Sequence, residues 1–413
     1  MKNKLPEGWK EVELENLLLI NKSGCWGDEA DEKSGTPVIR STNFTKDLKL
    51  KEVKIAYRKI SKEDVKNKKL EYGDILLEKS GGGPGQPVGR VIIFNIKKER
   101  DFVCGNFIQI LRPDKNKIEF NYLYYYLNLL YSQGFTENLF NKTTGIQNLR
   151  LKDYLKIKIP LPPTQTQQKI VSILEKAEKA KEWRKEADEL TKELLKTVFM
   201  EMFGDPGKNP KKWKIIPIEG IALSKKGAIR MGPFGSQLKK HELVKEGVKV
   251  LWIENIVDNK FNPNGTKYIT EEKYEQLKGF TVNKGDIVLT MMGTIGRVEV
   301  VPDIGKSIIS SHLLKIEPDT SICNSIYLKW IIMSDFVQNQ FKDASHGAVM
   351  SGLNGGIIKS TKIPLPPITL QQKFASTVKE VEAMKEQQKH SKEQIDNLFN
   401  ALMQKAFKGE LVV

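Results

Sequence analysis

The chain has 413 residues, 39% apolar and 29% charged, a composition that is typical of a folded globular protein and excludes a disordered one. Its 3 cysteines, Cys25, Cys104 and Cys323, lie far apart, which predicts neither a disulfide framework nor a metal site and fits a reducing cytoplasm. No apolar run approaches the ~18 residues of a membrane span, and the first run is very short, so we expect neither a membrane contact nor a signal peptide.

An internal repeat divides the chain. Lys-Ile-Pro-Leu-Pro-Pro at 158–163 recurs at 362–367, and Gln-Gln-Lys at 167–169 recurs at 371–373. Collinear with these, Gly-Asp-Ile at 73–75 recurs at 285–287, Gly-Arg-Val at 89–91 recurs at 296–298, and Pro6 and Trp9 match Pro210 and Trp213. Collinear matches indicate two copies of one unit, a compact domain followed by a long segment. This predicts compact domains at 1–163 and 209–367 and long segments at 164–208 and 368–413.

The compact domains combine short strands with helices, which predicts an α+β fold of two pseudo-repeated mixed domains. A strand follows Gly73 in the first domain and Gly285 in the second, because Gly-Asp is a turn signal before an apolar run. Residues 121–131 and 325–337 predict helices. The first of these carries four tyrosines, for most of which core packing is the expected role: Tyr122, Tyr124, Tyr125 and Tyr126.

Both long segments predict helices, over 164–204 and 368–408. Prolines precede each start, neither glycine nor proline interrupts 165–203, and Gly204 follows the end. Apolar residues recur at alternating steps of three and four, which predicts a coiled-coil-like seam. The seam residues are Ile170, Ile173, Ala177, Ala180, Ala187, Leu194, Val198, Phe374, Val381, Met384, Ile395, Leu398 and Leu402.

The middle of each seam is polar, at the equivalent residues Arg184 and Gln388. A helix of ~40 residues reaches ~60 Å, longer than a small domain is wide, so we prefer a paired spacer to an amphipathic helix lying on its own domain. The connectivity then makes the two helices antiparallel and relates the domains by a pseudo-two-fold axis.

The net charge of +16 lies almost entirely on the compact domains. Residues 1–160 carry +8 and residues 209–364 carry +7, whereas the long segments are nearly neutral. Two basic modules on a neutral spacer indicate two contacts with a polyanion such as nucleic acid.

Glycine-bearing loops supply the candidate DNA contacts. The loop at 80–85 and its counterpart at 290–297 bring backbone N–H groups close to a ligand, with a hairpin as the alternative reading, and polar loops at 141–148 and 344–351 carry side chains suited to base edges. The DNA-binding candidates are Arg40, Lys79, Ser80, Gly82, Arg90, Lys142, Thr143, Thr144, Gln147, Arg230, Gln237, Lys239, Lys240, Thr290, Thr294, Arg297, Ser345 and His346.

Searches for catalytic motifs fail. Gly305-Lys306-Ser307 resembles the end of a phosphate-binding loop, but Val300 occupies the position where that motif requires glycine. The 4 histidines are scattered without metal-ligand spacing, and no amino-methyltransferase signature occurs, because Pro-Pro is found only within Leu-Pro-Pro. We therefore expect no catalytic residue and no metal.

The Gly-Asp-Ile strands, the Gly-Arg after each glycine loop, the Ile-Pro-Leu-Pro-Pro junctions and the Gln-Gln-Lys helix starts together resemble the specificity subunit of type I restriction-modification systems. The resemblance covers the whole chain and is most specific at 160–169 and 364–373. It implies that each compact domain is a target-recognition domain for one half of a split, asymmetric site in double-stranded DNA, and that the helices set the gap between the halves.

The resemblance also implies a cytoplasmic subunit without catalysis or a cofactor of its own. It would dock two methyltransferase subunits, which use S-adenosylmethionine to methylate adenine, and optionally ATP-driven restriction subunits. Three alternatives stay open: a protein–protein scaffold, a recognition fragment of a type IIG restriction enzyme, and a stand-alone methyltransferase or nuclease, which the missing motifs disfavour.

Overall fold

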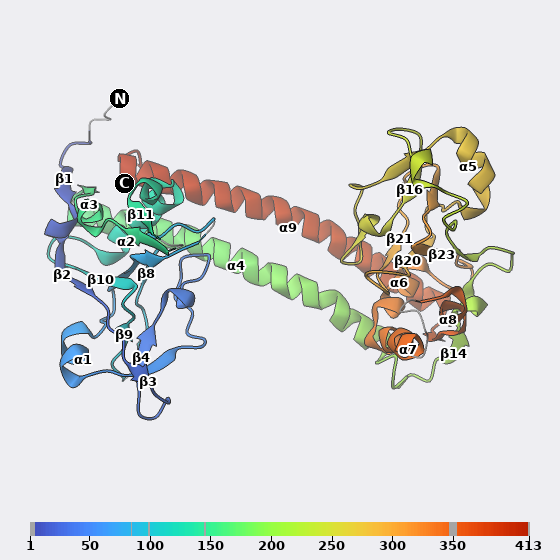
Figure 1. Cartoon of the computed structure of the whole chain (residues 1–413), viewed down its shortest axis with the longest axis horizontal. Coiled ribbons are helices and arrows are strands. Elements are labelled where there is room, and N and C mark those ends of the chain that lie inside the picture. The colour runs from blue at the N-terminus through green and yellow to red at the C-terminus, as the bar shows by residue number, and fades with distance from the viewer. Residues whose placement is uncertain (1–4, 84, 98–99, 144–145, 347–352, 412–413) are drawn as a thin grey trace. The chain divides into compact units, whose positions relative to one another are not determined.

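The computed structural model describes residues 5–83, 85–97, 100–143, 146–346 and 353–411, without the side chains at 142, 143, 345 and 346. The chain forms two compact units. Unit 1 contains residues 1–185 and 390–413, and unit 2 contains residues 186–389 (Figure 1). Half of each long helix therefore belongs to each unit. The units are defined by packing and the sequence domains by the repeat, so the domain boundaries given above stay predictions.

Unit 1 alternates short strands and helices before the first long helix begins. Its elements are β1 (Lys10–Glu13), β2 (Leu18–Ser23), β3 (Asp28–Glu29), β4 (Thr36–Ile39), β5 (Ala56–Lys59), α1 (Lys62–Lys68), β6 (Ile75–Glu78), β7 (Ser80–Gly81), β8 (Val91–Ile93), β9 (Val103–Cys104), β10 (Ile108–Pro113), α2 (Phe120–Ser132), β11 (Phe140–Thr143), β12 (Ile146–Leu149), α3 (Leu151–Leu155), β13 (Lys158–Leu161) and α4 (Thr164–Phe203), of which unit 1 holds the first half.

The central sheet of unit 1 is antiparallel, in the order β2–β10–β6–β8. Alternate residues of β6 face opposite sides, as a strand requires. Ile75 and Leu77 join a core with α2 and the long helices, whereas Leu76 joins a second core with β9 and β10. A second sheet, β3–β5–β4–β9, contains the parallel pair β4–β9.

Unit 2 repeats this plan. Its elements are β14 (Lys214–Pro217), β15 (Ile229–Met231), β16 (Val248–Leu251), β17 (Ile256–Val257), β18 (Lys260–Phe261), β19 (Lys267–Ile269), α5 (Glu271–Leu277), β20 (Ile287–Thr290), β21 (Val298–Val300), β22 (Ser307–Ile309), β23 (Leu313–Ile316), α6 (Ser325–Met333), α7 (Asp335–His346), α8 (Gly355–Ser360), β24 (Lys362–Leu365) and α9 (Ile368–Lys408), of which unit 2 holds the first half. The sheet β15–β23–β20–β21 corresponds to β2–β10–β6–β8, and the parallel pair β16–β22 corresponds to β4–β9.

The repeated motifs connect the long helices to the cores. The side chain of Gln167 is 1% exposed, accepts a hydrogen bond from the Glu119 N–H (2.9 Å) and donates one to the Pro162 carbonyl (2.9 Å). Gln371 makes the same pair of bonds, with the Asn324 N–H (2.8 Å) and the Pro366 carbonyl (2.7 Å). These bonds satisfy buried backbone groups at the start of each helix, which explains why this glutamine recurs.

The tyrosines of α2 are structural. Tyr122, Tyr124 and Tyr125 are buried, and their hydroxyls donate to the Pro160 carbonyl (2.6 Å), the Leu48 carbonyl (2.9 Å) and the Glu178 carboxylate (2.9 Å). Burial raises the pKa of each of these hydroxyls. In unit 2 the hydroxyl of Tyr327 makes the bond equivalent to that of Tyr122, to the Pro364 carbonyl (2.5 Å). The prediction of core packing is thus correct.

Each long helix ends at a glycine with positive φ, Gly204 (78°) or Gly409 (74°). A Cβ at Gly204 would lie 2.6 Å from Pro210 Cγ, and a Cβ at Gly409 would lie 2.1 Å from Pro6 Cγ. Only glycine allows this approach. The C-terminal end of α9 therefore packs against the N-terminal segment in unit 1 as the end of α4 packs against residue 210 in unit 2.

Within each unit the halves of α4 and α9 run antiparallel. In unit 2, Gln388 Nε2 donates to Thr191 Oγ1 (2.9 Å), and further along the pair the ring of Phe199 meets that of Phe374 edge-on, with centroids 5.4 Å apart. In unit 1, Lys181 forms an ion pair with Asp396 (3.0 Å), and Ile170 shares a core with Phe407. The prediction that the two long helices pair in antiparallel orientation is thus confirmed within each unit.

The buried register of the helices differs in part from the predicted seam. Leu194, Met384 and Leu398 are 40%, 44% and 56% exposed, so these predictions are wrong. The other predicted seam residues are buried or half-buried: Ile170, Phe374 and Val381 are buried, and Ile173, Ala177, Ala180, Ala187, Val198, Ile395 and Leu402 are half-buried.

The buried positions at the end of α4 follow a spacing of four residues, from Thr191 through Leu195 and Phe199 to Phe203. That spacing is the stripe of a helix that packs on a globular core, whereas a strict seven-residue repeat assumes that only the partner helix covers the face.

The helix predicted over 325–337 is interrupted. Ser334 has an extended backbone (ψ 148°) and separates α6 from α7, and its side chain donates to the Ile331 carbonyl (2.6 Å). Serine favours such local bonds over continuation of a helix. None of the helices within the described ranges is both long enough and apolar enough to cross a membrane.

Candidate nucleic-acid interface

The glycine loop of unit 1 lies beside the second polar loop that the sequence singled out. Ser80 and Gly81, which form β7, pair with Asn148 and Gln147 of β12 in a three-stranded sheet with β11. Ser80 Oγ donates to Asn148 Oδ1 (2.9 Å), and the backbone N–H groups of residues 79 and 80 donate to the Phe107 carbonyl. The structure thus brings two separately predicted loops to one place.

Two candidates at this place are buried and serve the fold. Arg90 is 7% exposed, and its guanidinium donates to both carboxylate oxygens of Glu78 (2.7 and 2.9 Å) and to the Ser41 carbonyl (3.3 Å). Gln147 is 9% exposed and accepts from the Val88 N–H (3.1 Å). Both side chains are therefore bonded inside the unit, and their predicted contact with DNA stays a prediction.

The remaining candidates of unit 1 lie nearer the surface. Lys79 is half-buried and donates to Ser23 Oγ (2.6 Å) and Gln109 Oε1 (3.2 Å), and burial lowers its pKa. Gly82 is exposed, with a positive φ of 67°. Arg40 is half-buried and donates to the Lys54 carbonyl (2.8 Å). The side chains of Lys142 and Thr143, and all of Thr144, lie outside the described residues.

In unit 2 the loop after β20 has a different construction. Thr290 is fully buried and accepts a hydrogen bond from the Arg297 N–H (3.0 Å), so its side chain serves the loop, and its contact with DNA stays a prediction. Thr294 is exposed, and its carbonyl accepts the Thr290 hydroxyl. The Arg297 side chain is 34% exposed and lies 3.6 Å from Asp258.

Arg90 and Arg297 are equivalent in the repeat but differ in their surroundings: Glu78 of unit 1 corresponds to Thr290 of unit 2. Without a carboxylate at that position, Arg297 stays at the surface and remains accessible to a ligand.

A second group of unit 2 candidates surrounds the turn after β15. Arg230 is exposed, lies over the Phe280 ring (3.9 Å to its centroid) and donates to the Gly279 carbonyl (3.2 Å). Gln237 accepts from the Phe234 N–H (3.1 Å), which closes the turn. Lys239 and Lys240 follow it and are exposed. The side chains of Ser345 and His346 lie outside the described residues.

Comparison with known proteins places this arrangement in a family. A family model described as the type I restriction modification DNA specificity domain matches residues 6–192 and, a second time, residues 210–397. The chain belongs to the type I restriction-modification DNA specificity family.

Relatives match this specificity subunit over nearly its full length. The MjaX and MjaVIII type I restriction enzyme specificity subunits of Methanocaldococcus jannaschii are 25% and 23% identical to it, and the alignments cover 99% of this chain and 95% and 94% of theirs. The S subunit structure from M. genitalium is 16% identical with a TM-score of 0.54 and covers 98% of this chain and 97% of its own, so it supports the fold alone.

The polar surroundings of Lys79 contain residues that the sequence reasoning missed. Gln109 Nε2 donates to Asn21 Oδ1 (2.6 Å), which connects Lys79 through Gln109 to β2. A position-by-position alignment of the two repeats could have found them, because the strand register aligns the polar residues Gln109 and Asn21 with the apolar residues Leu314 and Ile229.

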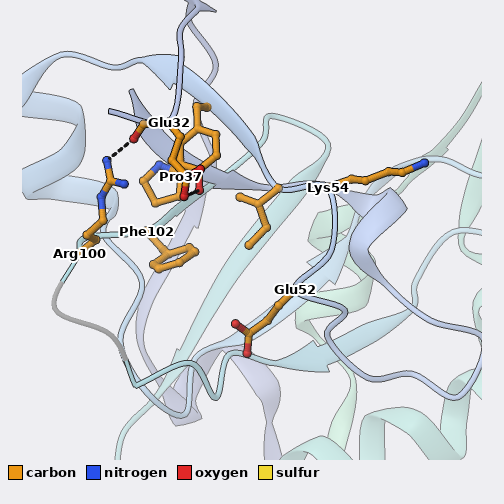
Figure 2. Close-up of a pocket in the computed structure, with 8 residues that line it drawn as sticks. Glu32, Pro37, Glu52, Lys54, Arg100 and Phe102 are labelled. Carbon is orange, nitrogen blue, oxygen red and sulfur yellow. Dashed lines mark hydrogen bonds between the residues drawn. The ribbon is translucent and has the colours of Figure 1, made fainter. Parts of the chain in front are cut away.

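A hollow of about 390 Å³ lies over the second sheet of unit 1 (Figure 2). Arg100 on its rim donates to the carbonyls of Glu32 (2.8 Å) and Gly35 (3.1 Å), and the Tyr57 hydroxyl donates to the Glu32 carboxylate (3.0 Å). Both carboxylates and cations line the hollow, which does not favour a phosphate backbone. Among the described residues no cluster of histidine, cysteine, aspartate and glutamate is arranged to hold a metal ion.

Proposed function

We propose that this specificity subunit is a non-catalytic reader of a split, asymmetric site on double-stranded DNA, with one half-site for each unit. The observation that carries the proposal is the combination of one repeated scaffold with two different sets of side chains around the glycine loops. Base edges are recognised by side chains, so two copies of one scaffold with different side chains suit two different half-sites. The nearly equal excess charge of the two sequence domains suits contact with phosphates on both sides.

Binding of the full chain to duplex DNA over a salt series tests this function. We expect the binding constant to fall steeply between 50 and 200 mM salt, by roughly 0.9 in logarithmic slope for each neutralised phosphate. A protein–protein scaffold, the second candidate, would show no sequence preference and no such slope. Assay of the purified chain for methyl transfer tests the enzyme alternatives, and activity of the chain alone would overturn our reading.

We further propose that the subunit works in the cytoplasm and docks two methyltransferase subunits, which bind S-adenosylmethionine, and optionally restriction subunits, which bind ATP. Leu194 and Leu398 occupy equivalent positions in the two repeats and are 40% and 56% exposed. Leu190, one turn before Leu194, is 67% exposed. Exposed apolar side chains at repeated places on helices favour docking of the same kind of partner to each unit.

The long helices would set the gap between half-sites. Deleting seven residues from α4 and seven from α9 keeps the helical register of each, and we expect it to change the number of base pairs between the half-sites and not the half-sites themselves. Sequencing of methylated DNA from cells that express the variant with its methyltransferase measures both. A changed half-site sequence would contradict the modular reading.

A further inference from the structure

Unit 1 contains a set of polar side chains on a sheet face that is apolar in unit 2. The set, which we call the polar cluster, consists of Asn21 and Ser23 on β2, Gln109 on β10 and Lys79 directly after β6. Lys79 Nζ donates to Ser23 Oγ and Gln109 Oε1, and Gln109 Nε2 donates to Asn21 Oδ1. Gln109 is 4% exposed, Ser23 and Lys79 are half-buried, and Asn21 is exposed, so the cluster extends from the sheet interior to the surface.

The strand registers give each member an equivalent in unit 2. Ile75 pairs with Leu111 as Ile287 pairs with Ile316, and the same registers align the polar cluster, in order along the chain, with Ile229, Met231, Met291 and Leu314. Met291 and Leu314 are fully buried in the core of unit 2. The scaffold therefore accepts apolar residues at these positions, so the fold itself does not require the polar ones.

The ammonium group of Lys79 is the part of the cluster that points to a ligand. It carries three N–H donors, and it donates hydrogen bonds to two oxygens, Ser23 Oγ and Gln109 Oε1, both of which are uncharged. No carboxylate of the described residues forms an ion pair with it. A partly desolvated cation without a counterion binds an anionic or strongly polar acceptor more tightly than a solvated one does.

The surroundings of Lys79 fit a nucleic acid. The exposed glycine loop follows it directly, Asn148 is exposed on the neighbouring strand, and the ring of Phe107, which is 51% exposed, lies 4.0 Å from where a Cβ of Gly81 would be. Small residues allow a backbone to approach closely, and amides and an exposed ring can contact bases.

We propose that the polar cluster is a DNA contact site that unit 1 has and unit 2 lacks, in which Lys79 donates to a phosphate oxygen or to the O6/N7 edge of a guanine. Ser23 and Gln109 are positioning residues that hold the ammonium. The inference rests on the proposed function, and it identifies which side chains of unit 1 carry part of that function.

The test uses the complex of the full chain with its methyltransferase subunits, on duplexes that carry the methylated site of the wild type and its single-base variants. Lys79→Met introduces the residue that unit 2 has at this position, so unit 1 should fold. Lys22→Met is the matched control, because Lys22 is exposed on β2 and loses the same charge. We expect Lys79→Met to weaken binding about 10- to 100-fold and Lys22→Met to weaken it much less.

The pattern of loss distinguishes the two acceptors. If Lys79 reads a guanine, Lys79→Met abolishes discrimination at one base pair of a half-site. If it binds a phosphate, all sequences weaken alike and the salt slope falls by about one. Equal affinity and equal base preference for Lys79→Met and Lys22→Met would overturn the inference. Absence of any sequence preference in the wild-type complex would instead overturn the proposed function.

A second variant separates positioning from folding. Gln109→Glu places a carboxylate beside Lys79, which supplies the missing counterion without emptying the site. We expect the thermal stability of this variant to equal or exceed that of the wild type while its DNA binding falls as far as in Lys79→Met. Wild-type DNA binding by Gln109→Glu would overturn the role assigned to the ammonium.

Discussion

The two units build the same corner of the fold with different charges. In unit 1 the carboxylate of Asp74 accepts two hydrogen bonds from Arg112 (2.7 and 2.8 Å). The strand register aligns Asp74 with Asp286 and Arg112 with Glu317, so unit 2 has a glutamate where unit 1 has the arginine. Lys315 forms an ion pair with Glu317 (2.6 Å) and neutralises its charge. Both carboxylates at the Gly-Asp turn accept a backbone N–H, so the turn is retained while the charges around it are rearranged.

A second comparison shows how such exchanges change the surface. The Glu78–Arg90 pair is buried in unit 1, whereas Thr290 of unit 2 leaves Arg297 at the surface. The arginine of unit 1 therefore supports the fold, whereas its equivalent in unit 2 lies at the surface beside Asp258. The two repeats share the backbone fold but differ in the side-chain hydrogen bonds and ion pairs that it carries.

The largest expected effect comes from the buried ion pair. Arg90→Met leaves the Glu78 carboxylate buried without a partner and should destabilise unit 1 by about 3–5 kcal/mol. Arg297→Met should change the stability of unit 2 by less than about 0.5 kcal/mol, because the side chain is at the surface. Hydrogen exchange of the β6 and β20 amides measures the two units separately. Equal effects of the two variants would erase the contrast between the units.

The second largest effect is expected at the buried glutamine that both units have at the start of a long helix. Gln167→Leu and Gln371→Leu each remove a buried side-chain amide and leave a backbone N–H and a backbone carbonyl without their hydrogen-bond partner, so each should cost about 2–3 kcal/mol in its own unit. The exposed neighbours provide the controls, Gln168→Leu and Gln372→Leu, which should be nearly neutral. Chemical denaturation monitored by exchange checks this, and a response in only one unit would contradict the equivalence of the two helix starts.

A smaller effect depends on pH. Burial, assisted by the nearby Glu317, raises the pKa of Asp286 from 3.8 to about 6, so the folded unit binds this proton more tightly than the unfolded chain. The charged carboxylate therefore costs stability above pH 6, and the cost is relieved as the pH falls through 6 towards 4. Asp286→Asn should stabilise unit 2 at pH 7.5 by on the order of 1–3 kcal/mol and gain progressively less at lower pH.

The opposite sign is expected for the equivalent residue, since Asp74→Asn breaks the bonds to Arg112 and should destabilise unit 1 at pH 7.5. Thermal unfolding of both variants between pH 5 and pH 8 gives the comparison. A pH-independent gain for Asp286→Asn would show that its carboxylate is not the titrating group.

The smallest effect is expected at the exposed leucines. Leu194→Ser and Leu398→Ser should alter stability by less than about 0.5 kcal/mol, whereas Leu195→Ser, one residue further along and 1% exposed, should cost several times more. Comparing the unfolding midpoints of the three variants fixes the buried register of α4. A large loss at Leu194 would restore the register predicted from the heptads.

The sequence predicted the helices and the repeat well because their signals are local. Prolines before residue 164, glycine at 204 and an uninterrupted run between them define α4 to within one residue of its observed end. The seam failed at Leu194 because the sequence does not show that a globular core covers the helix there. The sequence did not show that Arg90 is buried against Glu78, because the two residues lie 12 positions apart in the chain and only the strand register brings their side chains together.

The packing of Gly409 against Pro6 has a consequence for how the molecule is assembled. In unit 2, residues 205–209 connect the end of α4 covalently to Pro210, against which Gly204 packs. In unit 1, Gly409 at the end of α9 packs against Pro6 in the same way, but no short segment of chain connects the two. Neither repeat holds a complete core, because Phe407 of the second repeat packs in the core of unit 1 and Phe199 of the first repeat packs in the core of unit 2. Cutting between residues 204 and 210 would yield two half-chains that must exchange their helices to fold, which makes association of the halves a condition of their stability.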